Sequence, residues 1–447
     1  MRSILDVYYM KKTQIVVVGG GAGGLELVRR LGARYGRSHH DIILVDRNRS
    51  HIWKPLLHEV AAGSLDANMD EVGYGGHGAR WRYRYFNGTL EAVDRDKQFI
   101  VTAPMFDDEG HEIIGRHRIR YDYLVLAVGG VSNTFGVPGV LEHCLFLETR
   151  QQADYFRQKL LNQCLRVSHI SETTSQSPRV RVCIIGGGAT GVELAAELYN
   201  AAESLKNYGL EVFDASRLSV TLLEAGSRIL PALPATLADA ARAELEDRGV
   251  HVMTGAQVSE VAEGEVRTKS GEMIGSEITV WAAGVKGPKL LSSLDGLETD
   301  AADRIVVRPT LQTTRDERIF AIGDCCSCRD GRGNRSIPPR AQAAHQMATS
   351  VFRNLNTAMR SGDLNNLKPF VYRDHGSLVT LSRFSTVGSL MGNLIGGRMA
   401  IEGRLARLAY LSLYRLHLLA IHGRLRGIVT IVLNQINQIV RPNLKVH

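Results

Sequence analysis

Two stretches of the chain share the same order of apolar, glycine and helix-forming positions. A short β-branched run, Ile15 to Val18, precedes GGGAGGLELVRRL, and a second run, Val182 to Ile185, precedes GGGATGVELAAEL. Each apolar run predicts a buried strand, and the residues after each glycine group predict a helix that starts at once. The glycine groups begin 167 residues apart, which is too far for a solenoid repeat and fits a duplicated domain. The pattern therefore predicts two βαβ domains.

Further apolar runs complete this prediction of an α/β fold. They are YDYLVLAVGG, which ends at Gly130, ITVWAAG at 278–284 and IFAIGD at 319–324, and a helical pattern covers 340–355. Residues 82–123 are rich in strand-forming positions, and the Ser- and Thr-rich residues 168–178 predict a loop. We expect one nucleotide-binding domain at 1–150 and 301–370, a second at 151–300, and a C-terminal region at 371–447 that ends in two helices.

The glycines of both groups follow the spacing G-x-G-x-x-G. The first set is Gly19, Gly21 and Gly24, and the second is Gly186, Gly188 and Gly191. In a dinucleotide-binding loop the first glycine makes a tight turn, the second lets the backbone approach a pyrophosphate, and the third allows close helix packing. The helix that follows offers free amides and a partial positive charge. A single such loop is often only a tight turn, whereas two copies in the same context favour two nucleotide sites.

An acidic residue closes the second predicted strand of each domain. Asp46 ends IILVD, 22 residues after Gly24, and Glu224 ends VTLLE, 33 residues after Gly191. A carboxylate about 20 residues after the loop binds ribose hydroxyls in such domains, so the second spacing requires an insertion near 207–216. The alternative for each acid is a solvated strand end. Because a carboxylate repels a 2′-phosphate, Glu224 predicts a preference for NADH over NADPH.

The charge of the chain is concentrated at its end. The formal net charge is +8, and residues 403–447 hold seven basic residues and no acidic one. If 404–422 form one helix, its basic face contains Arg404, Arg407, Arg415 and His422, with Leu416 and Leu419 pointing away. From 428 onward a second apolar face contains Val429, Val432, Ile436 and Ile439. Basic amphipathic helices lie in the membrane interface, so we expect contact with an anionic membrane surface; a core-packing or dimerisation helix pair is the alternative.

The composition excludes several classes of protein and of site. With 44% hydrophobic and 22% charged residues, the chain is neither disordered nor collagen-like. Its six cysteines form no disulfide framework for this length, and no run of eighteen apolar residues predicts a spanning helix. Cys325, Cys326 and Cys328 could bind a soft metal but lack the second pair of ligands of a zinc site. We therefore expect no metal site.

The motifs resemble those of a known class of flavoproteins. The paired loops, YDYLVLAVGG, ITVWAAG and IFAIGD occur in this order in flavoproteins with two dinucleotide-binding domains, which include glutathione reductase. Disulfide reductases of that class carry a redox cysteine pair in the region that here reads HIWKPLLHEVAAGSLD and contains no cysteine. The segments HIWKPLLHEVAAG, GGGATGVELAAEL, LQTTRD, AIGDC and AQAAHQ, the last similar to an AQxAxQ motif, resemble bacterial type II NADH:quinone oxidoreductases. These are single-chain respiratory enzymes that do not pump protons.

This resemblance implies one non-covalent FAD, NADH as substrate and a quinone, ubiquinone or menaquinone, as acceptor. The cofactor-binding residues that it implies are Gly19, Gly21, Ala22, Gly23, Gly24, Asp46, Arg47, His51, Lys54, Ala127, Gly129, Gly323, Asp324, Ala343, Ala344, Gly186, Gly188, Ala189, Thr190, Gly191, Glu193, Glu224, Ala283 and Gly284. The catalytic residues that it implies are Glu193, Gln342, Gln346, Lys54 and His375. Gln342 and Gln346 stand on one helical face, where two amides could bind quinone carbonyls.

The location and the rival functions follow from the same features. The N-terminal residues lack the apolar stretch of a secretory signal, which with the basic tail favours a peripheral protein on the cytoplasmic face of the bacterial inner membrane. A homodimer stays open, and no nucleic acid is expected. A sulfide:quinone reductase would need reactive cysteines near the flavin, for which Cys325 to Cys328 give slender support. A flavin- and NADH-bound redox sensor or interaction protein is the rival from another class.

Overall fold

The computed structural model of the chain describes residues 12–36, 40–65, 71–173, 178–205, 215–330, 336–381, 386–391, 398–402 and 414–440. The chain forms two compact units. The first contains Met1–Ile52, Glu71–Val131 and Val285–Arg373, and the second contains Trp53–Asp70, Ser132–Gly284 and Asp374–His447. These units differ from the domain ranges expected from the sequence, because the second unit also contains Trp53–Asp70. The expected domain ranges stay a prediction.

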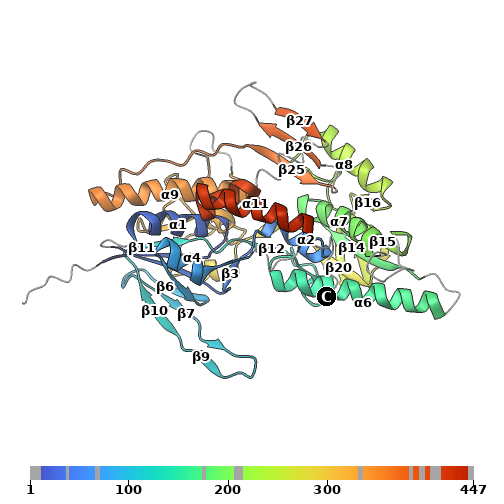
Figure 1. The fold of residues 1–447 in the computed structure, drawn as a ribbon, viewed down its shortest axis with the longest axis horizontal. Helices are drawn as coiled ribbons and strands as arrows, with labels where there is room; N and C mark the ends of the chain where they lie inside the picture. The colour runs from blue at the N-terminus through green and yellow to red at the C-terminus, as the bar shows by residue number, and fades with distance from the viewer. Residues whose placement is uncertain are drawn as a thin grey trace, which may run out of the picture. The chain divides into compact units, whose positions relative to one another are not determined.

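The first unit is built on a five-stranded parallel sheet. Its strand order is β23-β11-β1-β2-β5, with β1 (Thr13–Val18), β2 (His40–Asp46), β5 (Arg84–Asn87), β11 (Tyr123–Leu126) and β23 (Ile319–Ala321). Residues 15–18 of β1 and 42–45 of β2 are continuously buried, as expected for parallel strands covered on both faces. Helices α1 (Ala22–Tyr35) and α9 (Ala341–Ser361) lie side by side along one face of this sheet (Figure 1).

Smaller elements complete the first unit. A three-stranded antiparallel sheet has the order β10-β7-β6. The remaining elements are β3 (Ser50–His51), β4 (Val72–Gly73), α4 (Tyr74–Trp81), β6 (Leu90–Asp94), β7 (Phe99–Thr102), β8 (Met105–Phe106), β9 (Glu112–Ile114), β10 (His117–Arg120), β21 (Val285–Lys286), η4 (Lys289–Ser293), β22 (Ile305–Val306), η5 (Gly323–Cys325) and β24 (Cys326–Ser327). Strand β12 (Val131–Ser132) lies where the chain passes to the second unit.

The second unit repeats the plan of the first. Its parallel sheet has the order β13-β20-β14-β15-β16, with β13 (Cys144–Leu145), β14 (Val180–Ile185), β15 (Leu218–Glu224), β16 (His251–Thr254) and β20 (Ile278–Trp281). A three-stranded antiparallel sheet, β17-β18-β19, again accompanies it. In both units the strand before the glycine loop is central and the strand that ends in the acid is its neighbour. This confirms the prediction of an α/β fold with two duplicated parallel sheets.

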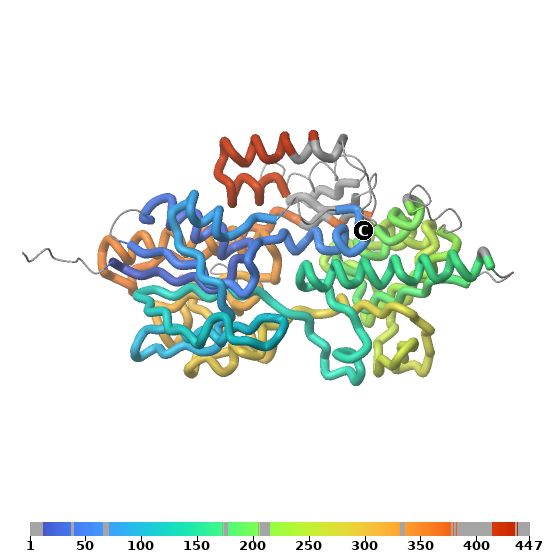
Figure 2. The backbone as a smooth tube through the Cα atoms, turned by 60° about the horizontal axis from the view of Figure 1, so that its bottom comes forward, coloured from blue at the N-terminus to red at the C-terminus, as the bar shows by residue number. Residues whose placement is uncertain are grey.

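The second unit contains further helices and strands besides this sheet. Helix α2 packs against both α6 and α7, and Figure 2 shows the blue α2 beside the long green α6. The elements are η1 (Lys54–Leu56), α2 (Leu57–Ala62), α5 (Val140–His143), α6 (Arg150–Thr173), α7 (Ala189–Leu205), η3 (Ala215–Arg217), α8 (Ala235–Asp247), β17 (Val258–Ala262), β18 (Glu265–Thr268), β19 (Met273–Gly275), β25 (Gly376–Thr380), β26 (Thr386–Met391), β27 (Arg398–Glu402) and α11 (Arg424–Val440).

The loop predicted at 168–178 is wrong over its first part. Helix α6 continues to Thr173, and residues 174–177 lie outside the described residues. The hydroxyls of Ser171 and Thr173 donate to the carbonyls of Val167 and His169 one turn earlier. Polar side chains that bond backward in this way are compatible with a helix, so composition alone misplaced its end.

The two predicted C-terminal helices are present within the described residues, as 414–422 and α11. Residues 403–413, including Arg404 and Arg407, lie outside the described residues. Within 414–422, Leu416 is 59% exposed, whereas His417 is buried and stacks on Trp53 with 3.9 Å between ring centroids. The expected basic face stays a prediction. Among the described residues, no helix has both the length and the apolar character needed to cross a membrane.

Candidate active site

The first glycine loop is tightly packed at Gly19 and Gly24 and open at Gly21. Gly19 has φ +102°, and a Cβ there would lie 2.3 Å from the carbonyl oxygen of Ala127. A Cβ at Gly24 would lie 1.9 Å from the carbonyl oxygen of Gly19. By contrast, a Cβ at Gly21 would meet nothing within 4 Å, and Gly21 begins α1 without a capping side chain. The loop therefore leaves open space at a helix N-terminus, where an anionic group can bind.

The second glycine loop has the same geometry. Gly186 has φ +117°, and its Cβ would lie 2.8 Å from the carbonyl carbon of Ala282. A Cβ at Gly191 would lie 2.1 Å from the carbonyl oxygen of Gly186, while one at Gly188 would meet nothing within 4 Å. Because Gly188 immediately precedes α7, this loop offers the same kind of open helix N-terminus.

The two acids are bonded to their loops in the same way. Asp46 accepts hydrogen bonds from the backbone amides of Gly20 at 2.6 Å and Asn48 at 2.7 Å. Glu224 accepts hydrogen bonds from the amides of Gly187 and Gly226, both at 2.7 Å. Burial raises the pKa of Asp46, and the bond from Gly20 opposes that shift. Each carboxylate thus lies at the loop, and its oxygens have further lone pairs for hydroxyl groups.

Most of the other predicted cofactor-binding residues lie at the carboxyl ends of parallel strands or in first helical turns, whereas His51 lies in β3 and Lys54 begins η1. In the first unit, Ala22, Gly23, Ala343 and Ala344 begin α1 and α9, Arg47 follows β2, Ala127 and Gly129 follow β11, and Gly323 and Asp324 follow β23. In the second unit, Ala189 and Thr190 begin α7, and Ala283 and Gly284 follow β20. The carboxyl edge of a parallel sheet is where such folds bind their ligands.

The residues predicted to be catalytic are divided between the units. Gln342 and Gln346 lie on α9 in the first unit, and the Gln346 amide is bonded to the backbone of Arg373 through both its polar atoms, at 2.8 and 2.9 Å. Lys54 and His375 belong to the second unit, and both are exposed. Because an amide nitrogen carries two hydrogens, Gln346 could donate one to Arg373 and the other to a quinone carbonyl.

Glu193 is buried beside a histidine that the sequence reasoning missed. Its side chain is 8% exposed, and one carboxylate oxygen lies 3.6 Å from Nδ1 of His58, which is 4% exposed. Burial lowers the pKa of His58 to about 4, so that its imidazole is neutral at pH 7. Both residues belong to the second unit, where α2 packs against α7. Glu193 is therefore a buried acid and not a solvated one at a helix end. In the sequence, the only signal for His58 was its place in the segment HEVAAG.

The cysteines are buried and unreactive in character. Burial raises the pKa of the Cys325 and Cys328 thiols to about 12, and that of Cys326 well above its ordinary value. Cys325 donates to the carbonyl of Ile322, and Cys326 lies 3.8 Å from the sulfur of Met347. A thiol must lose its proton to act as a nucleophile or a metal ligand, so this cluster does not resemble a reactive site.

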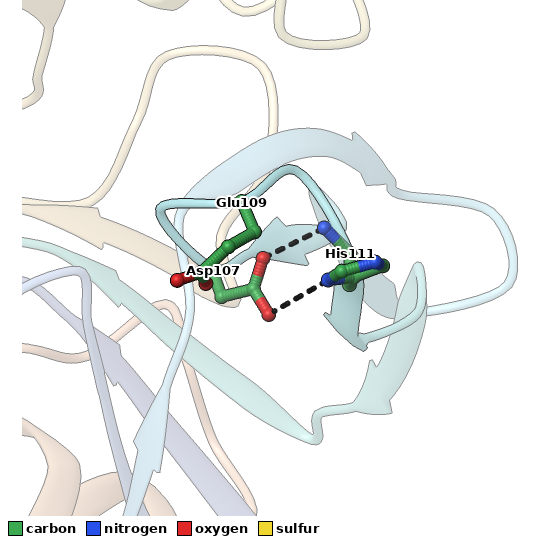
Figure 3. Close-up of side chains that lie close together, drawn as sticks. All are labelled: Asp107, Glu109 and His111. Carbon is green, nitrogen blue, oxygen red and sulfur yellow. Dashed lines mark hydrogen bonds and ion pairs between the residues drawn. The ribbon is translucent and has the colours of Figure 1, made fainter.

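A cluster of potential metal ligands within the described residues lies elsewhere, in the β8–β9 hairpin. Asp107, Glu109 and His111 are all exposed, with their ligand atoms within 4.8 Å of one another. Figure 3 shows the Asp107 carboxylate turned toward His111, whose backbone amide donates to it at 2.7 Å and whose ring nitrogen lies 3.4 Å away. These contacts close a tight turn, and exposed acidic groups of this kind are common without a metal.

Comparisons with known proteins agree with this geometry. Residues 13–348 match the family described as "Pyridine nucleotide-disulphide oxidoreductase". The chain is 41% identical over 445 residues to a type II NADH:quinone oxidoreductase of Haemophilus influenzae, covering 97% of this chain and 99% of that protein.

Two solved structures share the fold. The structure of NDH2 from Plasmodium falciparum in complex with NADH matches with a TM-score of 0.80 at 19% identity, covering 97% of this chain and all of that one. A sulfide:quinone oxidoreductase of Aquifex aeolicus matches with a TM-score of 0.68 at 18% identity, covering 92% of each chain.

Proposed function

Since the chain belongs to the family of type II NADH:quinone oxidoreductases, we propose that its first glycine loop binds FAD and its second binds NADH. The protein is an FAD-dependent enzyme that oxidises NADH and reduces a quinone. The observation that carries the placement is the repeated loop, with open space at Gly21 and Gly188 beside an acid at the end of the neighbouring strand.

The first unit fits FAD. The open helix N-terminus at Gly21 suits a pyrophosphate, and Asp46 suits the ribose hydroxyls. When bound, the flavin supplies the hydride and electron chemistry, while the protein supplies binding and orientation. The residues that would hold it include Gly19, Gly24, Gly129, Gly323 and Asp324, all at the carboxyl edge of one sheet.

The buried pair Glu193 and His58 suits the handling of a proton. Transfer of a hydride from NADH and formation of the quinol together consume one proton from solvent. We propose that the Glu193 side chain holds this proton, with the neutral His58 packed beside it. A Glu193→Gln variant should lower the rate of quinone reduction, and unchanged rates of NADH oxidation and quinone reduction would remove Glu193 from the mechanism.

The quinone side of the reaction rests on α9. We propose that the amides of Gln342 and Gln346 bind quinone carbonyls, with Lys54 and His375 as further candidates for the catalytic region. Gln342→Ala should raise the KM for a soluble quinone and leave the KM for NADH unchanged. Gln346→Ala would also remove the two bonds of this side chain to the backbone of Arg373.

Helix α11 supports the proposal of a membrane surface as partner. Its exposed apolar side chains follow helical spacing, and Arg424 and Arg426 at its start are also exposed. The exposed apolar residues are Leu425, Ile428, Val429, Val432, Leu433 and Ile436. We propose a peripheral protein on the anionic cytoplasmic leaflet of the bacterial inner membrane; a homodimer stays a prediction.

Vesicle flotation tests the membrane proposal. The protein should float with vesicles that contain anionic lipid and less with zwitterionic ones. Val432→Asp, in the apolar face, should abolish flotation, whereas Thr430→Asp on the same helix should reduce it only slightly. Equal flotation of the two variants would argue against α11 as the contact.

An anaerobic titration tests the function as a whole. NADH should bleach the flavin absorbance, and a soluble quinone analogue should restore it. Bleaching without recovery would support the assignment of the two nucleotide sites and contradict the assignment of quinone as the acceptor. Sulfide should not bleach the flavin, since the Cys325 cluster is buried and its thiols keep their protons.

A further inference from the structure

Two buried side chains converge on one carbonyl group of the first glycine loop. The hydroxyl of Tyr74 donates to the carbonyl oxygen of Gly20 at 2.8 Å, and Nδ1 of His51 lies 2.9 Å from the same oxygen. Tyr74 is 2% exposed and His51 is 5% exposed. Because a carbonyl oxygen only accepts hydrogen bonds, Nδ1 of His51 must carry the proton in this bond.

The local fold brings these donors to the loop. Strand β3 pairs antiparallel with β4, with His51 opposite Val72, and Tyr74 is the first residue of α4 directly after β4. The amide of Tyr74 also donates to the carbonyl of Arg49 at 3.0 Å. The Tyr74 ring fills the place of a side chain at Gly20, because a Cβ there would lie 2.4 Å from the ring. Gly20 is thus required although it is an unspecified position of the G-x-G-x-x-G spacing.

The peptide bond between Gly20 and Gly21 transmits this restraint. A trans peptide is planar, so its C=O and N–H groups point in opposite directions. Fixing the carbonyl of Gly20 with two donors therefore fixes the direction of the Gly21 amide. On the preceding side, the amide of Gly20 is fixed by its bond to Asp46. The Gly21 amide thus lies at the N-terminus of α1, at the position where the loop is open.

We propose that Tyr74 and His51 are positioning residues for FAD, which hold the Gly20–Gly21 peptide so that the Gly21 amide is oriented toward the pyrophosphate. The inference rests on the proposed placement of FAD at this loop. A preorganised donor binds an anion more tightly than a mobile one, since the loop loses less freedom on binding.

The surroundings keep Tyr74 a donor. Burial, and next the negative charge of Asp46, raise the pKa of Tyr74 well above its ordinary value. The phenol therefore keeps its proton near neutral pH, so that it can donate to the carbonyl of Gly20.

Removal of one hydroxyl tests the proposal with little change in packing. Tyr74→Phe should weaken FAD binding roughly tenfold, measured as FAD released on dilution or dialysis and as the dissociation constant on reconstitution. The matched control is Tyr199→Phe, since the Tyr199 hydroxyl donates to the carbonyl of Gly249 at 2.8 Å, is also buried, and belongs to the second unit. The control should lose similar thermal stability and keep its FAD affinity.

Each outcome has one meaning. Weaker FAD binding in Tyr74→Phe alone supports the proposal, and His51→Leu should then have an effect in the same direction. Equal FAD affinity in both tyrosine variants, whether changed or unchanged, would overturn it. Gly21→Ala separates this failure from that of the site: if Gly21→Ala loses FAD while Tyr74→Phe keeps it, only the positioning role is wrong, and if Gly21→Ala keeps FAD, the proposed site is wrong.

Discussion

The glycine loops of the two units differ in the groups that donate hydrogen bonds to one carbonyl, that of Gly20 in the first loop and that of Gly187 in the second. In the first unit the carbonyl of Gly20 accepts from two side chains, Tyr74 and His51. In the second unit the carbonyl of Gly187 accepts from one backbone amide, that of Leu230, at 2.7 Å. The strands, the glycines and the acids are otherwise equivalent.

This difference matches the two tasks that we assign to the loops. A prosthetic group stays bound through many turnovers, and side-chain donors that fix its loop favour slow release. A substrate nucleotide must leave after each turnover, so extra restraint on its loop would slow the cycle. The duplicated fold thus provides the same phosphate site twice, and the residues around each loop set how long the nucleotide remains.

The largest expected effect separates the two loops. Gly24→Ala and Gly191→Ala each place a methyl group about as close to a backbone oxygen, at 1.9 Å and 2.1 Å. Overpacking against backbone should cost about 3 kcal/mol or more in each case. Gly24→Ala should lose FAD, whereas Gly191→Ala should stay yellow but no longer be bleached by NADH.

A nearby glycine provides the control. Gly76→Ala lies within α4, where a Cβ meets nothing within 4 Å, and it should keep both nucleotides and slightly gain stability. Absorbance spectra before and after NADH, together with thermal unfolding, measure all three variants. Loss of FAD from Gly191→Ala as well would show that the loops do not act separately.

Acid should affect the second unit through His58. Its pKa is about 4 in the folded chain and near 6.5 when unfolded, so the unfolded chain binds more protons between these values. The free energy of unfolding should therefore fall by about 3 kcal/mol as the pH is lowered from 6.5 to 4. Asp46 in the first unit has a raised pKa, so its contribution is present at low pH and lost as the pH rises.

Denaturant unfolding at pH 7 and pH 4.5 measures this effect. His58→Asn should show a smaller loss on acidification than the unchanged chain, and His111→Asn, at an exposed position, should behave like the unchanged chain. The same pH dependence in His58→Asn and the unchanged chain would contradict the assignment to His58.

The sequence predicted the duplicated features and missed the contacts around them. Apolar runs, glycine spacing and strand-end acids are local patterns, so they located both sheets, both loops, Asp46 and Glu224. The partners of these loops come from distant segments: Tyr74 is 54 residues from Gly20, and nothing local in YGGHGARW indicates a carbonyl partner.

The errors have the same origin. The amphipathic pattern of the C-terminal region gave no role to His417, which the structure buries against Trp53 from the N-terminal part of the chain. His58 is invisible to spacing because its environment depends on how α2 packs against α7. Tertiary contacts between remote segments therefore decided the residues that pattern analysis could not assign.

The smallest expected effect concerns the choice of nucleotide in the second loop. The Glu224 carboxylate accepts from the amides of Gly187 and Gly226, and its charge would repel a 2′-phosphate. Glu224→Ala removes that charge and frees two amides that can donate to phosphate, so the ratio of kcat/KM for NADH over NADPH should fall roughly tenfold. Asp46→Ala, its counterpart in the first unit, should weaken FAD retention and leave this ratio unchanged. Steady-state rates with both nucleotides at saturating quinone measure this ratio. If the ratio fell as much in Asp46→Ala as in Glu224→Ala, the two acids would not serve different nucleotides.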